Sequence, residues 1–334
     1  MRIQRLVIEN FKSIERIELV DPNPFTVFVG PNGSGKSNIF EALEFGNRVE
    51  RSLPYEAFRL FGGTDALLRR SGNINANFLV SYTYDDEPWN SQQSLNLIYL
   101  DEHKNTTIDS GKGRPQLIGA VTFEVVSNPF LFGFSRLAAY EKKPRLNFQD
   151  DQSLNTNASN LEAVLKRVLT LPSVKEEIHE WLSLFIPGFK AVEVVSGSLD
   201  GRDTLLVYEQ TVEKPFTRNL VSDGTYNILT LLTAVYQSDE PQFLCIEEPE
   251  NGLHPEVLES LINFFRNRCE EKGHYIWLNT HSESIVKLLT TDEIVLVNKR
   301  DGATQTKQVK GMNTYSLTTD EAWLSGALGG GLAW

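Results

Sequence analysis

Residues 30–37 combine three glycines with a lysine and a serine, a set that can hold phosphate groups. The run Gly30-Pro-Asn-Gly-Ser-Gly-Lys-Ser37 fits the pattern G-x-x-x-x-G-K-S/T. Glycines let the backbone curl so that successive N–H groups point at phosphate oxygens, and a following helix adds its positive N-terminal end. We expect Lys36 to reach the β- and γ-phosphates of a nucleotide and the Ser37 hydroxyl to ligate Mg²⁺. The expected nucleotide contacts in this loop are Asn32, Gly33, Ser34, Gly35, Lys36, Ser37 and Asn38.

Carboxylates follow a short apolar run at residues 243–250. The run Phe243-Leu-Cys-Ile-Glu-Glu-Pro-Glu250 predicts a buried strand that ends in acidic groups at the carboxyl edge of a sheet. We expect this strand to lie adjacent to the phosphate-loop strand, with Glu247 in the magnesium shell. Glu248 would then accept a proton from the attacking water. An ordinary acidic loop after a core strand is the alternative interpretation.

Two further features suit the same chemistry. Leu220-Val-Ser-Asp-Gly-Thr225 precedes a long apolar helix, and the free N–H groups at a helix start with Ser222 and Gly224 can meet a phosphate. A plain helix cap is the alternative. His281 ends the segment Trp277-Leu-Asn-Thr-His281, where its side chain could touch the γ-phosphate or the attacking water, although a lone histidine is often structural. The expected catalytic residues are Glu248, His281 and Lys36.

The elements that must position these residues alternate in type. A strand over 25–29 and a helix from 36 to about 45 flank the glycine-rich loop, after two strands within 2–20. Three β-rich runs between 73 and 126 predict an antiparallel sheet beside the main one. Two amphipathic helices, over 160–170 and 174–186, then precede a hairpin around Asp200-Gly201.

The final third alternates helices with strands, which indicates a mostly parallel sheet covered by helices. The expected helices are 224–236, 255–266 and 284–289, and the expected strands are 243–246, 275–278 and 294–297. We therefore expect an α/β chain in three parts. Residues 1–150 would carry the phosphate loop and the antiparallel β subdomain, 151–215 the short helical insertion and hairpin, and 216–334 the acidic strand and His281.

Composition limits the function classes. The 334 residues are 40% hydrophobic and 23% charged, which is ordinary for a globular chain and excludes general disorder. The 32 basic and 44 acidic residues give a net charge of −12, which disfavours nucleic-acid binding over the whole surface but allows local basic patches at 69–70 and 142–145. No apolar run is long enough to cross a membrane, the start lacks a secretory signal, and two cysteines cannot build a disulfide framework. We expect a soluble, cytoplasmic protein that does not bind a membrane.

Taken in order, the phosphate loop, the Ser222–Gly224 helix start, the acidic strand and His281 resemble the ABC-type ATPases of the soluble RecF, SMC and OLD-like branch. Residues 1–19 and 251–255 resemble that branch as well, so the likeness covers roughly residues 1–50 and 215–300. It implies a P-loop NTPase head with a mixed sheet that binds and hydrolyses ATP with Mg²⁺. It also implies a head-to-tail dimer around ATP, in which Ser222 and Gly224 of one copy complete the site of the other. Lys12 and Ser13 would lie near the nucleotide.

The sequence departs from this family pattern in three ways, the first being that a glutamine-containing loop cannot be placed in it. Glu247 stands where the superfamily usually has Asp, and the middle segment has no heptads, so a long coiled coil is not expected. Without room for a nuclease domain after the last expected strand, the chain is expected to regulate a separate effector. Its resemblance to standalone OLD-like ATPases implies that this effector is a nuclease or toxin and that the role is in bacterial anti-phage defence. The alternative is a RecF-like clamp that binds duplex DNA. A P-loop kinase or GTPase is disfavoured, because neither class needs a strand-terminal histidine together with a Ser-Asp-Gly helix start.

Overall fold

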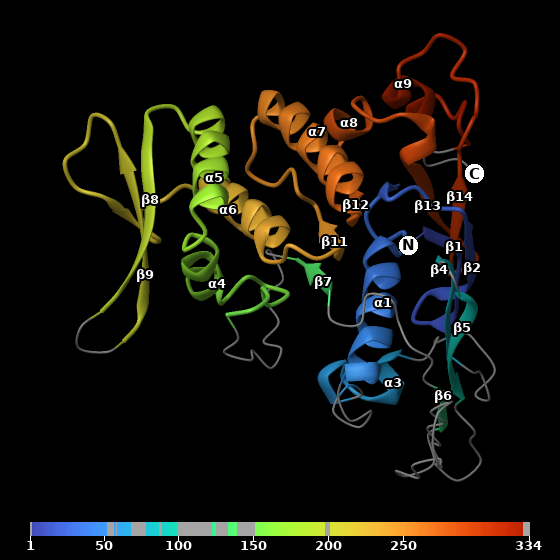
Figure 1. Ribbon diagram of the computed structural model, residues 1–334. Helices are drawn as coiled ribbons and strands as arrows, with labels where there is room; N and C mark the ends of the chain where they lie inside the picture. Colours follow the sequence, from blue (N-terminus) through green and yellow to red (C-terminus); the bar gives the residue numbers. More distant parts are fainter. Residues whose placement is uncertain are drawn as a thin grey trace.

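Among the described residues of the computed structural model, eleven strands form one mixed sheet and three form a second, separate sheet (Figure 1). The order in the large sheet is β6-β5-β4-β1-β2-β14-β13-β3-β12-β11-β7, and the small sheet has the order β10-β9-β8. The structure describes residues 2–51, 57, 59–67, 78–86, 89–98, 122–124, 133–138, 151–197 and 201–329.

Five neighbouring strands of the large sheet run parallel. They are β7 (Phe134–Leu137), β11 (Phe243–Glu247), β12 (Tyr275–Thr280), β3 (Phe25–Val29) and β13 (Ile294–Arg300). Every residue of β3, β11 and β12 is buried. Parallel strands covered on both faces are mostly apolar, as these sequences are. The mostly parallel core that the alternating pattern predicts is therefore present, with β7 as an additional strand that the sequence did not predict.

Helices cover the two faces of this parallel core. α1 (Lys36–Arg51) packs on one face, and α6 (Asp223–Tyr236) and α7 (Pro255–Lys272) pack on the other. α8 (Glu283–Val286) packs against α7, and α9 (Thr319–Leu324) packs against α8 (Figure 1). The remaining short elements are α3 (Thr64–Leu67) and the 3₁₀-helix η1 (Thr291–Glu293).

The parallel strands send alternate side chains into two hydrophobic cores. Val27 and Leu244 join the core that contains α6 and α7, whereas Phe28, Cys245 and Trp277 join the core under α1. Successive residues of a strand face opposite sides of a sheet, so the same five strands hold both cores. This arrangement fixes the carboxyl ends of the strands, where the polar residues of the site begin.

The antiparallel strands extend the large sheet and do not form a separate one. β1 (Arg2–Phe11) pairs with β2 (Ile14–Val20) on one side and with β4 (Phe78–Asp86) on the other, and β4 pairs with β5 (Trp89–Ile98). β6 (Thr122–Glu124) completes the edge. The predicted antiparallel strands are therefore present, but the expectation that they form a sheet beside the main one was wrong, because they belong to the main sheet. β1 and β2 provide pairing edges that join the two parts, which a local β pattern cannot reveal.

One further strand closes the gap between the antiparallel and parallel parts. β14 (Ala303–Gln308) pairs antiparallel with β13 and, through Thr304 and Ile14, parallel with β2. The sequence predicted neither β14 nor α9. The consequence for function is that Thr304 and the β1–β2 turn lie beside the loop that follows β3.

The helical insertion packs against α6 on one side and against the small sheet on the other (Figure 1). It contains α4 (Leu161–Val168) and α5 (Pro172–Phe185), and the apolar stripes of both helices are buried in the core of α6 and α7. The small sheet contains β8 (Phe189–Ser196), β9 (Asp203–Glu209) and β10 (Phe216–Thr217), in antiparallel pairing. The α/β class, the helical insertion and the hairpin predicted from the sequence are thus present. No helix in the described part of the chain is long and apolar enough to span a bilayer.

Candidate functional site

The loop that follows β3 takes a shape that only glycine permits at several positions. Gly33 and Gly35 have φ angles of 79° and 102°, in the region that side chains disfavour. A Cβ atom on Gly30 would overlap the carbonyl oxygen of Val297, and one on Gly35 would overlap the hydroxyl of Thr304. The glycine spacing is therefore required both by the backbone turn and by the close approach of β13 and β14. Residues 30–37, called the P-loop from here on, lead directly into α1.

Lys36 lies folded into the P-loop. Its Nζ atom donates hydrogen bonds to the carbonyl oxygens of Gly30, at 2.6 Å, and Pro31, at 3.0 Å. Burial lowers the pKa of Lys36 from its ordinary value, and the nearby carboxylates of Glu248, Glu250 and Glu247 oppose that shift. The ammonium group is thus held inside the loop by acceptors that phosphate oxygens could replace.

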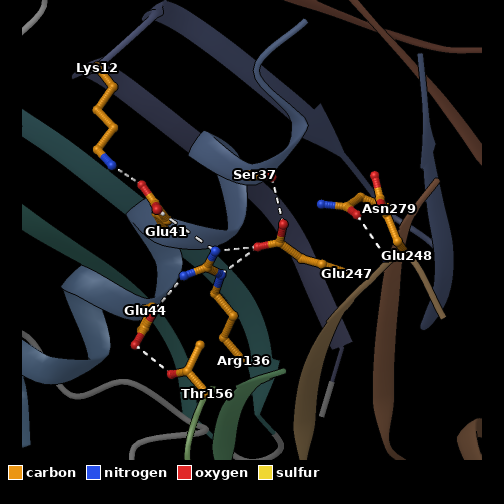
Figure 2. Close-up of polar contacts among 9 residues, drawn as sticks. All are labelled: Lys12, Ser37, Glu41, Glu44, Arg136, Thr156, Glu247, Glu248 and Asn279. Carbon is orange, nitrogen blue, oxygen red and sulfur yellow. Dashed lines mark hydrogen bonds and ion pairs between the residues drawn. The ribbon is translucent and has the colours of Figure 1, made fainter. Parts of the chain in front are cut away.

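Ser37 and Glu247 meet at the start of α1 (Figure 2). The Ser37 hydroxyl donates to Oε2 of Glu247 at 2.6 Å, and the Glu247 side chain is 0% exposed. The other carboxylate oxygen, Oε1, accepts from Nε of Arg136 at 2.6 Å. The prediction that the acidic strand is adjacent to the P-loop strand was wrong, because β12 lies between β3 and β11. Glu247 still reaches Ser37, since α1 begins over the ends of these strands.

Glu248 and His281 form a second polar pair at the same edge of the sheet. Nδ1 of His281 is 3.1 Å from Oε1 of Glu248, and the two side chains are 43% and 22% exposed, so water reaches both. The backbone N–H of Glu248 donates to the carbonyl oxygen of Asn279 at 3.0 Å and to its Oδ1 at 3.2 Å. The geometry brings together a carboxylate and an imidazole at the strand ends, where the sequence predicted them.

Ser13 and Thr304 support the P-loop from behind. The Ser13 hydroxyl accepts from Nδ2 of Asn38 at 2.6 Å and lies 2.6 Å from the Thr304 hydroxyl. Thr304 Oγ1 in turn donates to the carbonyl oxygen of Ser34 at 2.9 Å. The structure thus places Ser13 beside the P-loop, and Lys12 forms an ion pair with Glu41 on α1. The expected proximity of both residues to the nucleotide stays a prediction.

Ser222 and Gly224 begin α6. The Ser222 hydroxyl accepts from the N–H of Thr225 at 3.2 Å, which is the helix-cap interpretation left open by the sequence. Gly224 packs so closely on Gly252 that a Cβ atom there would overlap the Gly252 carbonyl oxygen. Asn227, one turn further on, donates from Nδ2 to the carbonyl oxygens of residues 249 and 251, at 2.9 Å each. These contacts therefore hold the start of α6 against the loop after Glu248.

Two further histidines have structural roles, and both cysteines are buried. His254 caps α7, because its Nδ1 accepts from the N–H of Glu256 at 3.3 Å. His274 accepts from the N–H of Gln242 at 3.1 Å, and burial lowers its pKa to about 4. Both cysteines are buried and unbridged, and burial raises the pKa of each thiol. His103 and the basic clusters at 69–70 and 142–145 lie outside the described residues.

Three residues at this site were missed by sequence reasoning: Arg136, Asn279 and Thr304. For Arg136 the sequence offered a signal: it is a single arginine within a mostly apolar run. A buried charge needs a partner of opposite sign, so this arginine could have been expected to pair with a carboxylate. Asn279 stands two residues before His281 and was visible in the same segment. Thr304 carried no local signal, because its role comes from a strand pairing across 291 residues with Ser13.

The polar atoms of the site are suited to a nucleoside triphosphate that is bound together with a divalent cation. Among the described residues, the buried atoms without a hydrogen-bond partner include Ser34 Oγ, Glu250 Oε2 and Asn279 Nδ2, which come from the P-loop and the strand ends. In that part of the chain, no group of three or more His, Cys, Asp or Glu side chains is arranged to hold a metal. Mg²⁺ needs no such cage, since it commonly binds one or two protein oxygens plus phosphate oxygens. The Ser37 hydroxyl and the Glu247 carboxylate are protein oxygens of this kind.

Comparisons with known families match both halves of the site. The model described as "AAA domain, putative AbiEii toxin, Type IV TA system" matches residues 86–287, and the model "RecF/RecN/SMC N terminal domain" matches residues 2–59. An ATP/GTP phosphatase of Helicobacter pylori is 20% identical over 353 residues, which cover 91% of this chain and 91% of the relative. The DNA replication and repair protein RecF of Chlorobium phaeobacteroides is 29% identical over 180 residues, and the match spans 51% of this chain but only 44% of RecF.

A solved SMC head, bound to the C-winged helix domain of ScpA, has the same fold. It superimposes with a TM-score of 0.59 at 13% identity, covering 95% of this chain and 100% of that structure. The AAA model alone covers more than half of the chain. The chain belongs to this AAA family, and it is an ABC-type ATPase of the RecF/SMC branch.

Proposed function

We propose that this ATPase binds ATP with Mg²⁺ at the P-loop, hydrolyses it with Glu248 as the general base, and acts as a switch on a separate effector. One observation carries the proposal: Ser37, Glu247, Glu248 and His281 converge at one edge of the sheet, with Ser37 Oγ 2.6 Å from Glu247 and His281 Nδ1 3.1 Å from Glu248. Ligands of open α/β sheets bind at this edge, outside the carboxyl ends of the strands.

Binding would use groups that the chain already aims into the P-loop. The loop N–H groups and the start of α1 favour phosphate oxygens. Lys36 would exchange its bonds to the Gly30 and Pro31 carbonyls for phosphate oxygens. Ser37 and Glu247 would hold Mg²⁺, which in such sites neutralises charge that develops on the phosphate oxygens.

For hydrolysis, Glu248 would accept the proton of a water that attacks the γ-phosphorus, while the bond to the bridging oxygen of ADP breaks. Glu248 Oε1 lies against His281 Nδ1, so the imidazole would orient the carboxylate and contact the same water or the γ-phosphate. Asn279 fixes the backbone of Glu248, and its buried Nδ2 is a further donor directed at this region.

Nucleotide titrations of Lys36→Ala test the binding step. We expect the affinity for a fluorescent ATP analogue to fall at least about 100-fold, close to 3 kcal/mol, because a charge-assisted phosphate contact is lost. Lys287→Ala, at an exposed lysine after α8, is the matched control and should bind as the wild type does. Undiminished affinity in Lys36→Ala would contradict the P-loop assignment.

The switch would operate between two copies. In this proposal, the exposed Ser222 and the N-terminal N–H groups of α6 meet the γ-phosphate held by a second copy, so ATP closes a head-to-tail dimer and hydrolysis loosens it. The Gly224–Gly252 contact and the Asn227 bonds would transmit closure to the loop that carries Glu248. The description of the matching family names a toxin and a toxin–antitoxin system, which supports a toxin as the effector. A nuclease as the effector and a role in anti-phage defence rest on the resemblance found in the sequence.

A DNA-binding clamp is the second candidate, because the chain is 29% identical to a RecF over 180 residues. The net charge of −12 counts against it. Purifying the ATP-bound protein from native cells and sequencing its nucleic acid separates the two. A co-purifying nuclease or toxin favours the switch, and duplex DNA without a protein partner favours the clamp. The cytoplasmic location expected from the sequence stays a prediction.

A further inference from the structure

Arg136 forms ion pairs with Glu247 and with two carboxylates that have no part in the proposed chemistry, those of Glu41 and Glu44 (Figure 2). Nε of Arg136 donates to Oε1 of Glu247 at 2.6 Å, and its Nη2 contacts the same oxygen. Its Nη1 donates to Oε2 of Glu44 at 3.0 Å, and Nη2 lies 3.8 Å from Oε1 of Glu41. One guanidinium therefore faces three carboxylates from two elements.

The register of the sheet explains why these groups meet. Arg136 on β7 pairs with Cys245 on β11, and Glu247 lies two residues further along β11, on the same face. α1 covers this face and carries Ser37, Glu41 and Glu44 at positions i, i+4 and i+7, which form one stripe. The stripe therefore faces the strand ends, and Arg136 is the cation placed between them.

Burial and the planar shape of the guanidinium fix the orientation of the Arg136 ion pairs. The side chains of Arg136, Glu247 and Glu44 are 2%, 0% and 5% exposed, so water does not screen them. The planar guanidinium offers donors in several fixed directions, which a lysine ammonium on a flexible stem does not. At the far side of the cluster, the Thr156 hydroxyl donates to Oε1 of Glu44 at 3.2 Å.

We propose that Arg136 is a positioning residue for the metal site: it holds Oε1 of Glu247, so that Oε2 is presented to Ser37 and to Mg²⁺. This inference rests on the proposed binding of Mg²⁺ with ATP. Removing the guanidinium has two opposing consequences. Loss of orientation weakens the metal site, whereas loss of a positive charge close to Glu247 strengthens its attraction for a cation. The sign of the change in Mg²⁺ affinity therefore distinguishes positioning from a simple charge effect.

The test is a Mg²⁺ titration of the full chain with a non-hydrolysable fluorescent ATP analogue, compared with binding of the analogue in EDTA. For Arg136→Met we expect the half-saturating Mg²⁺ concentration to rise at least about tenfold, as is usual when a partner of a metal ligand is lost. Affinity in EDTA should stay within about twofold of the wild type, because Lys36 and the loop N–H groups are unchanged. Arg136→Lys should fall between the two proteins.

Arg266→Met is the matched control. Arg266 on α7 makes a two-point ion pair with Glu293, at 2.6 and 2.8 Å, so its loss also removes a partly buried arginine pair. We expect Arg266→Met to melt at a lower temperature with an unchanged Mg²⁺ dependence. If Arg136→Met does not give a cooperative melting transition, Arg136→Lys decides, with a rise of at least about threefold in half-saturating Mg²⁺ as the expected result.

Three results would overturn the inference. In Arg136→Met, the half-saturating Mg²⁺ concentration could equal that of the wild type, or it could be lower. Alternatively, the affinity for the analogue in EDTA could fall by as much as the affinity in Mg²⁺. With Mg²⁺ dependence intact in the wild type, any of these defeats the role of Arg136 alone. If the wild type binds the analogue equally well without Mg²⁺ and as weakly as Lys36→Ala, the proposed function fails together with this inference.

Discussion

Glu248 has a backbone conformation that non-glycine residues rarely adopt. Its φ angle is 46°, in the left-handed region, which costs on the order of 1 kcal/mol for a residue with a Cβ. Two acceptors of Asn279 hold its N–H, and Nδ2 of Asn251 donates to its Oε2 at 3.3 Å. The surroundings therefore offset the strain and aim the carboxylate towards His281. Backbone strain of this kind clusters at active sites and ligand clamps.

At this residue, Glu248→Gln is expected to keep nucleotide binding and lose turnover. The amide has nearly the same shape but cannot accept the proton of the attacking water, so the steady-state rate of phosphate release should fall by about 10²- to 10⁴-fold. Glu256→Gln, in the exposed first turn of α7, is the control and should turn over normally. A normal rate in Glu248→Gln would mean that another group is the base.

At the scale of elements, a buried histidine holds together the amino ends of β11 and β12. The site lies at the opposite, carboxyl ends of these strands. Nδ1 of His274 accepts from the N–H of Gln242, and the Gln242 carbonyl accepts from the N–H of Tyr275 at 2.7 Å. Desolvation, together with the positive charges of Arg268 and Lys272, lowers the pKa of His274 to about 4. The neutral imidazole is thus a structural acceptor between two central strands.

This histidine makes stability depend on pH. The unfolded chain binds the His274 proton near pH 6.5 and the folded chain only near pH 4, so stability is full above about pH 6.5 and falls as pH drops towards 4. The loss at this one group is on the order of 3 kcal/mol. His274→Asn keeps an acceptor without titrating, so its melting temperature should fall less than that of the wild type between pH 7 and 4.5. Parallel curves would show that His274 does not titrate with folding.

At the scale of the whole molecule, one mixed sheet carries two cores, and the site lies at the carboxyl ends of its parallel strands. The helical insertion and α6 share a core on one face, and α1 has its own core on the other. The P-loop lies at the start of α1, whereas Ser222 begins α6. The two helix starts that could hold phosphate thus belong to opposite faces, which is an arrangement suited to a site completed by a second copy.

Ser222→Arg tests that arrangement. A bulky cation at the start of α6 should leave nucleotide binding by one chain intact. It should weaken ATP-dependent dimerisation at least about tenfold, measured as the dimer dissociation constant by sedimentation of chains that also carry Glu248→Gln. Loss of the cap is expected to cost about 1 kcal/mol of stability, so melting is measured in parallel. Ser183→Arg, at an exposed serine of α5, is the control. An unchanged dimer would refute a role for Ser222 across the interface.

The sequence by itself determined the P-loop, the alternating elements of the final third, the helical insertion and the carboxylates at the end of β11. Each of these depends on residues close together in the chain. Glycine at fixed spacing sets the turn, a continuous apolar run sets a buried strand, and a polar residue directly after that run lies at the strand end. For the same reason Glu248 and His281 were found before any contact between them was known.

Only the tertiary structure decided that β12 separates the two strands of the site, that the antiparallel strands continue the main sheet, and that Arg136, Asn279 and Thr304 complete the site. Arg136 lies 111 residues from Glu247, and Thr304 lies 270 residues from Ser34. Strand order and register set these meetings, and both follow from which edges pair and which faces are buried. No local spacing records that choice, because it depends on packing across the whole sheet.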